Sequence, residues 1–158
     1  MPTIKVSQFR VAQFGSAPYG NLSVLPFQLK TNAVGAVVNS DTATGVASGD
    51  KIVLGCLPTG MRLDNCTAIV STALSAGVTG SLGFEYEDGI DSAVVPQDAA
   101  YFGAGIVLSA AARLVNASSK ALVTLPKPAF LILTTAGAAN AKVGLVDILV
   151  TGEMTGPR

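Results

Sequence analysis

The sequence contains no histidine and no tryptophan, and each absence excludes a class of function. Without histidine there is no imidazole base for a Ser-His or Cys-His catalytic site and no His ligand for zinc. Aromatic residues make up only 6% of the chain, which disfavours a broad stacking platform for sugars or bases. The sequence also has no phosphate-binding glycine loop and no nucleophile elbow. We therefore expect no enzyme activity and no cofactor.

Charge is scarce as well. Charged residues make up 13% of the chain, against about 25% in typical soluble proteins. The formal net charge is zero, so no global basic field attracts nucleic acid. No apolar run reaches the roughly 18 residues of a membrane helix, and the N-terminus lacks the apolar segment of a signal peptide. We expect synthesis in the cytoplasm and no membrane or nucleic-acid partner. The abundant apolar surface is predicted to be buried against other copies of the chain.

The candidate metal-binding and redox residues are few. Cys56 and Cys66 match neither a redox pair nor a zinc site in their spacing, and we interpret them as small buried apolar side chains. A disulfide between them would require that they face each other on paired strands, and a reducing cytoplasm argues against it. Five of the ten acidic residues lie within 85–98. Such a cluster can bind Ca²⁺ or supply paired carboxylates for glycoside hydrolysis, but the calcium-loop pattern is absent and we predict no metal.

The chain has 158 residues, a typical length for one domain. Its dominant pattern is short apolar stretches separated by Gly, Pro, Asn and Asp, which indicates β-strands. In 81–87, Leu82, Phe84 and Tyr86 share one face and the intervening glutamates the other, as in a half-buried antiparallel strand. The predicted strands are 21–30, 50–57, 61–74, 81–87, 120–125, 129–135 and 141–152.

Four segments need separate treatment. Pro26 interrupts 21–30 and predicts an edge strand or a bulge, because proline cannot donate a ladder hydrogen bond. Segment 97–104 is predicted to hold a short helix capped by Asp98. Segment 106–115 is ambiguous, since its alanines favour helix and its ends favour strand. Segment 32–49 is predicted to be a flexible, solvent-exposed loop.

These patterns predict an all-β protein: an antiparallel β-sandwich, jelly-roll-like rather than immunoglobulin-like, with one short helix and an extended N-terminal arm. The arm is placed at 1–20 and the single sandwich domain at 21–158.

The last two predicted strands are apolar on both faces. If Phe130 and Ile132 fill the interior of the sandwich, Leu131 and Leu133 point outward, because side chains alternate along a strand. Leu145 and Leu149 raise the same question in 141–152. We predict that neighbouring copies or an underlying shell cover these residues. The predicted interface of a dimer or trimer is Leu131, Leu133, Leu145 and Leu149.

The first twenty residues carry aromatic and basic side chains without any acid. One interpretation is a first strand followed by a loose leader. The other is an arm that docks on a partner through Phe9, Arg10, Phe14 and Tyr19.

Three motifs resemble those of a known family. Segment 49–63 reads GDKIVLGCLPTGMRL, 83–89 reads GFEYEDG, and 98–102 reads DAAYF. Over 49–152 the chain resembles capsid decoration, or cement, proteins and related head structural proteins of tailed bacteriophages. The resemblance implies a jelly-roll-like fold on the exterior of a virion capsid, made in the host cytoplasm, with the major capsid protein as partner. It carries over no functional residues, since the motifs encode strands and turns.

Other functions stay open at this stage. A head-fibre or tail component is the structural alternative. A glycan- or receptor-binding β-sandwich module is an alternative of a different class. Such a module needs an exposed cluster of aromatic residues, and the three tyrosines of this chain are scattered along the sequence.

Overall fold

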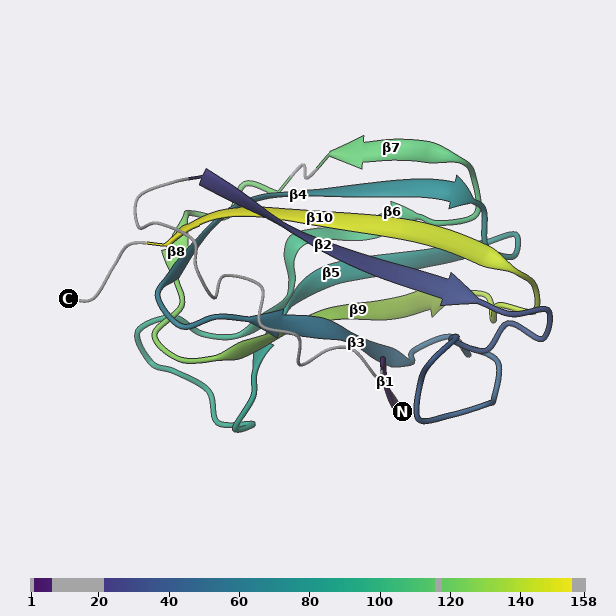
Figure 1. Cartoon of the computed structure of the whole chain (residues 1–158), viewed down its shortest axis with the longest axis horizontal. Coiled ribbons are helices and arrows are strands. Elements are labelled where there is room, and N and C mark those ends of the chain that lie inside the picture. Colours follow the sequence, from purple (N-terminus) through teal and green to yellow (C-terminus); the bar gives the residue numbers. More distant parts are fainter. Residues whose placement is uncertain (1, 7–21, 116–117, 155–158) are drawn as a thin grey trace.

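The computed structural model describes residues 2–6, 22–115 and 118–154, which form ten β-strands (Figure 1). No helix in these ranges is long and apolar enough to cross a membrane. The strands are β1 (Thr3–Lys5), β2 (Leu22–Thr31), β3 (Lys51–Leu57), β4 (Met61–Thr72), β5 (Val78–Tyr86), β6 (Asp98–Val107), β7 (Ala112–Val115), β8 (Val123–Thr124), β9 (Ala129–Gly137) and β10 (Gly144–Met154).

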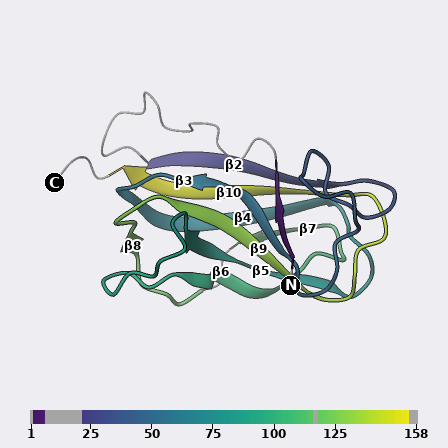
Figure 2. The same cartoon turned by 90° about the horizontal axis from the view of Figure 1, so that it is seen from below.

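The strands form two sheets that pack face to face. One has the order β1-β3-β9-β5-β6, and the other has the order β2-β10-β4-β7, with β8 paired to β4. Among the described residues β1 pairs in parallel with β3, and the other strand pairings are antiparallel. Figure 2 shows β2 and β10 side by side, as their register requires. The all-β, mostly antiparallel architecture is as predicted.

The core lies between the sheets and follows the alternation of each strand. Leu82, Phe84 and Tyr86 of β5 are each 1% exposed, which confirms the predicted inward face. Phe84 makes edge-to-face contacts with Tyr86 and Tyr101, with ring centroids 5.9 and 5.5 Å apart. Such pairs contribute roughly 0.5–1.5 kcal/mol each beyond the burial of their area. The aromatic residues therefore fix how β5 and β6 pack.

The predicted helix at 97–104 is wrong, because this segment belongs to strand β6. β6 pairs with β5 through Leu82 opposite Gly103 and Phe84 opposite Asp98, with register irregularities between them. Asp98 does accept a hydrogen bond from Ala100 N at 2.8 Å, as a helix-capping residue would, but it stands at the start of a strand. Pairing along β5 and burial of the aromatic residues outweigh the helix propensity of alanine.

The segment between β2 and β3 is also more buried than predicted. Ala36, Val37 and Val46 are at most 3% exposed. Asn140, itself 3% exposed, donates from Nδ2 to Thr31 Oγ1 at 3.1 Å and to Gly35 O at 3.4 Å. A side chain about a hundred residues away thus anchors this segment against the sandwich.

Part of the predicted arm belongs to the sandwich. Thr3–Lys5 forms β1 against β3, and Ile4 is only 2% exposed. The predicted docking residues Phe9, Arg10, Phe14 and Tyr19 lie outside the described residues. Pro26 lies in the edge strand β2, as its missing donor predicts.

Candidate functional site

The outer face of the β2-β10-β4-β7 sheet, here called the β10 face, carries apolar side chains that the chain itself only partly covers. Leu149 of β10 lies opposite Pro26 of β2 and Thr67 of β4, and Thr67 lies opposite Val115 of β7. Residues directly opposite each other share one face of a sheet. This row therefore crosses all four strands, from one edge to the other.

Further apolar residues extend this row toward one end of the edge strand β2. Leu22 and Val24 are 65% and 53% exposed, and Val115 at the opposite edge is 59% exposed. Leu145 and Leu149 are half-buried. The Gln28–Asp147 pair separates Leu145 from the Leu149 row. Partly exposed apolar residues gathered on one face are typical of a protein interface.

Four polar side chains on the β10 face form two cross-strand pairs. Gln28 donates from Nε2 to Asp147 Oδ1 at 2.8 Å, and Arg62 forms an ion pair with Glu153 at 2.5 Å. Cross-strand pairs of this type leave few unmatched charges to repel a partner. The face therefore combines apolar contact area with these two matched pairs and with two exposed basic residues, Lys30 of β2 and Arg113 of β7.

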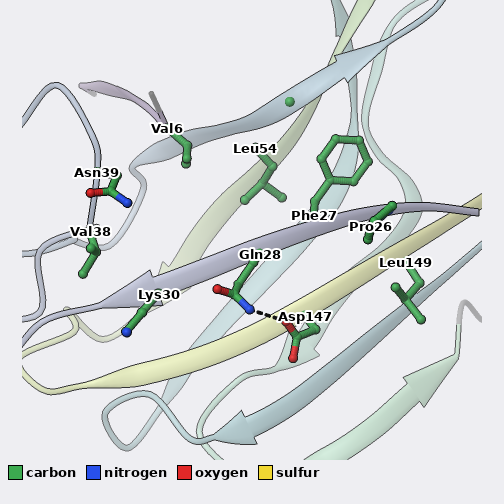
Figure 3. A pocket seen from close by; sticks show the side chains of 11 residues that line it. Val6, Pro26, Phe27, Gln28, Lys30, Val38, Asn39, Leu54, Asp147 and Leu149 are labelled. Carbon is green, nitrogen blue, oxygen red and sulfur yellow. Dashed lines mark hydrogen bonds between the residues drawn. The ribbon is translucent and has the colours of Figure 1, made fainter. Parts of the chain in front are cut away.

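A cleft of about 430 Å³ opens beside the edge strand β2, where the two sheets diverge (Figure 3). Its lining comes from both sheets and from the β2–β3 segment: Val6, Pro26, Phe27, Gln28, Lys30, Val38, Asn39, Leu54, Gly55, Asp147 and Leu149. Figure 3 shows the Gln28–Asp147 hydrogen bond on one side of this cleft and Val6, Val38 and Asn39 on the other. The cleft joins the β10 face at Pro26 and Leu149, so one partner can contact both.

Gly55 gives the cleft its floor. A Cβ atom at this position would lie 2.3 Å from Cε1 of Phe27. Gly55 sits at a register irregularity in β3, and its missing side chain lets the Phe27 ring reach from β2 across to β3. Phe27 is 6% exposed and thereby ties the two sheets together at their open edge.

The predicted orientation of Leu131 and Leu133 is wrong. Both are 0% exposed and belong to the core between the sheets. The reason is the register of β9 with β5, which places Leu131 opposite Phe84 and Leu133 opposite Leu82, both of which face inward. These two leucines cannot contact another copy of the folded chain.

The other side of β9 is apolar and buried as well. Phe130 and Ile132 lie on the outer face of their sheet with Val53 and Cys56, here called the β9 face. Val53, Phe130 and Ile132 are at most 7% exposed. Leu145 and Leu149 do lie on an outer face, so of the predicted interface only these two stay available.

The acidic cluster is largely matched by lysines. Lys51 pairs with Glu85 at 2.6 Å, Lys120 with Asp98 at 2.9 Å, and Lys127 with Asp88 at 2.7 Å. The hydrogen bond from Lys127 lowers the pKa of Asp88, and that from Lys120 lowers the pKa of Asp98. Among the described residues no group of three or more His, Cys, Asp or Glu side chains could hold a metal ion.

The two cysteines are not joined by a disulfide and lie on different faces. Cys66 is 3% exposed in the main core, and burial raises the pKa of its thiol to about 12. Cys56 is half-buried on the β9 face. Their interpretation as packed side chains without a disulfide agrees with these positions.

No family model matches the sequence, and no curated protein matches it. Solved structures do match the fold. A chain in the capsid of Ralstonia phage GP4 has a TM-score of 0.70 at 16% identity, covering 99% of this chain and 100% of that one. A chain in the cyanophage Pam1 capsid asymmetric unit has a TM-score of 0.60 at 17% identity, covering 93% and 94%. A chain in the acid-stable capsid of Helicobacter pylori bacteriophage KHP30 has a TM-score of 0.50 at 14% identity, covering 86% and 95%. The chain thus shares its fold with chains of phage capsids.

Proposed function

We propose that this chain is a structural protein of a bacteriophage virion that decorates the outside of the capsid shell and stabilises it. The likeness to chains of three phage capsids supports this proposal, since each match covers at least 86% of both partners. The sequence motifs around 49–63 point independently to the same class of protein. Its partners would be the major capsid protein and further copies of the chain, as a dimer or trimer.

The strand pairing supports a jelly-roll arrangement. β2 pairs with β10, β3 with β9, β4 with β7 and β5 with β6, so the pairings are nested within one another along the chain. An eight-stranded antiparallel ribbon folded back on itself and then wound into two sheets gives this pattern. On this view β1 and β8 are additions to the edges of the jelly roll.

The β10 face is the observation that carries the docking proposal. Leu145 and Leu149 are held on a rigid sheet beside Pro26 and the cleft, and burying a leucine completely contributes about 1.5–3 kcal/mol. Repetition around a shell makes modest contacts sufficient, because each docked oligomer binds through several sites at once. We propose that the shell or a neighbouring copy covers this face in the virion.

A structural role fits this chain better than the alternatives. Three acids of the 85–98 cluster are held in ion pairs with lysines. The likeness to capsid chains supports a structural, non-enzymatic function. Tyr86 and Tyr101 are at most 6% exposed, so they offer no stacking surface to a glycan. The matched chains belong to capsids, which favours a capsid position over a head fibre or tail.

The arm residues Phe9, Arg10, Phe14 and Tyr19 stay a proposed second contact with the shell. Deleting 1–20 would also remove β1 and its buried Ile4. A sharper test is therefore the double substitution Phe9→Ala and Phe14→Ala, which keeps β1. We expect it to weaken shell attachment while the thermal unfolding midpoint stays unchanged; full attachment would contradict the arm proposal.

The proposed function is tested by co-sedimentation with undecorated shells assembled from the major capsid protein. The wild-type chain is expected to bind to saturation, and Leu149→Lys at least tenfold more weakly, because a charge replaces an apolar contact. The matched control is Val143→Lys, at a 48% exposed valine next to the start of β10, which should bind like wild type. A wild-type chain that stays in the supernatant would contradict the proposal.

A further inference from the structure

Two separate surfaces of the chain each leave apolar groups accessible to a partner. One is the loop 87–97 between β5 and β6, here called the knob loop, and the other is a pocket between the edge strands β6 and β7. In Figure 1 the knob loop lies below the sandwich and β7 lies at its upper side. One molecule therefore cannot fill its own pocket with its own loop.

The knob loop presents large apolar side chains to solvent. Val94 is 86% exposed, more than any other large apolar residue of the described chain, and Ile90 is 65% exposed. Apolar residues at a loop tip gain free energy when a partner covers them.

The outer part of the knob loop is held by its own hydrogen bonds. Asp91 Oδ1 accepts from Ser92 N at 2.8 Å and from Gln97 N at 2.7 Å, which closes the loop. Ser92 Oγ accepts from Val94 N at 3.3 Å, directly at the exposed residue. A loop shaped in advance loses little conformational entropy when its tip is bound.

The base of the loop is fixed to the sandwich. Lys127 Nζ donates to both carboxylate oxygens of Asp88, at 2.9 and 2.7 Å, and to Ile90 O at 2.6 Å. The same ammonium lies 4.6 Å from the centroid of the Tyr86 ring. Tyr86 in turn donates its hydroxyl to Val95 O at 2.5 Å. The tip is therefore presented in one arrangement.

The pocket between β6 and β7 has an apolar lining and a volume of about 250 Å³. β6 and β7 are edge strands of their sheets, so the core is reachable between them. The short residues Gly103, Ala104 and Gly105 form its rim on β6, and Leu82, Phe102 and Leu114 lie among its lining residues. An apolar cavity of about 150 Å³ already accommodates benzene. The pocket is thus large enough for a valine or isoleucine side chain.

The charges beside the two surfaces are opposite in sign. Arg113 of β7 precedes the lining residue Leu114 in the chain, is exposed on the β10 face at this edge of the sandwich, and makes no ion pair with any described residue. The knob loop carries the acids Glu87, Asp88 and Asp91 and no basic residue, and Asp88 is paired with Lys127 at the base of the loop. Opposite charges at the rim of an apolar contact favour correct pairing and disfavour wrong partners.

We propose that Val94 of one copy enters the β6–β7 pocket of a second copy. The inference rests on the proposed self-association and specifies its geometry. Because the two surfaces differ, the contact is heterologous, and repeating it generates a ring where the rotation closes. Such a contact favours a trimer or larger ring over a two-fold dimer.

The test is cross-linking between two different variants in a background of Cys56→Ala and Cys66→Ala. A Val94→Cys chain is mixed with an Ala104→Cys chain under mild oxidation. We expect a disulfide-linked pair at least tenfold more abundant than with either variant alone. The matched control replaces the first chain by Val143→Cys, at another exposed valine. Circular dichroism verifies that each variant is folded.

Light scattering of the wild-type chain distinguishes failure of the proposed contact from failure of self-association. An oligomer without cross-linking above the control would overturn the proposed contact while self-association stands. A monomer at all concentrations, without cross-linking, would overturn both. As an independent variant, Ala104→Phe fills the pocket from its rim and should weaken oligomer formation at least tenfold; an unchanged oligomer would contradict the proposal.

Discussion

Strands β9 and β10 follow one another in the chain and both carry leucines or other large apolar residues on two faces, yet they end in different surroundings. Five consecutive residues of β9, from Ala129 to Leu133, are buried. In β10 buried and half-buried residues alternate from Gly144 to Gly152. Each strand lies in the interior of its own sheet. The comparison teaches that an apolar strand predicts coverage of both faces, but not whether the chain or a partner provides it.

The largest effect should come from the inner face of β9. Leu131→Ala removes a side chain that is 0% exposed, and large-to-small changes of this type cost about 2–5 kcal/mol of unfolding free energy. Leu149→Ala on the β10 face should cost less than about 1 kcal/mol. Urea denaturation followed by circular dichroism measures both. Equal losses of unfolding free energy in the two variants would contradict the proposed difference between the inner face of β9 and the β10 face.

A smaller effect is expected at the junction between the sheets. Gly55→Leu forces a side chain into the Phe27 ring, whose Cε1 lies 2.3 Å from the position of the new Cβ atom. Overpacking typically costs about 1–3 kcal/mol. The thermal midpoint should fall. Gly60→Leu, which has open space around it but a positive φ of 78°, should lower the midpoint through backbone strain alone and so measures a loss without a steric clash. A Gly55→Leu protein as stable as wild type would show that Phe27 does not join the sheets.

The buried thiol of Cys66 should make the stability of the fold depend on pH. The pKa of Cys66 is raised by burial from 9.0 to about 12 in the folded state. Its contribution to stability is therefore fully present below pH 9 and is lost as the pH rises toward 12. The loss should be up to about 1.4 kcal/mol per pH unit in that window. Urea denaturation at pH 8 and pH 10 measures this. Between the two pH values, the unfolding free energy should fall less for Cys66→Ala than for wild type, and equal losses in the two proteins would contradict the prediction.

The smallest effect concerns an exposed ion pair. Lys120 lowers the pKa of Asp98, so the pair stabilises the fold at neutral pH and ceases to do so as the pH falls below the ordinary Asp value. Because both side chains are solvent-accessible, Lys120→Ala should cost no more than about 0.5 kcal/mol at pH 7 and nothing at pH 2. The pKa of Asp98, followed by NMR, should rise in the variant. An unchanged Asp98 pKa would show that the pair does not persist in solution.

Strict alternation made the sequence informative. Leu82, Phe84 and Tyr86 were assigned to the core because polar or small residues separate them, and Asp147 likewise marks the outer face of β10. In 129–135 both faces are apolar, so alternation could not decide between Phe130 and Leu131. The register with β5 decides it, and that register depends on a strand some fifty residues earlier.

Long-range contacts also explain the other differences. Segment 97–104 has the composition of a helix, but pairing with β5 makes it a strand. The burial of 32–49 depends on Asn140, which local patterns cannot reveal. In the candidate site, the spacing of Leu145 and Leu149 predicts their place on an outer face. The Phe27–Gly55 contact and the pocket between β6 and β7 were not, since each requires two sheets brought together.

Hydroxyl-radical footprinting of the chain, free and assembled in phage particles, is the most direct test of the claim that a shell or neighbouring copy covers the β10 face. Leu145, Leu149 and Pro26 should be oxidised in the free chain and strongly protected in the particle, whereas Leu131 should be protected in both. Equal oxidation of Leu149 and Pro26 in the free and assembled chain would contradict the account.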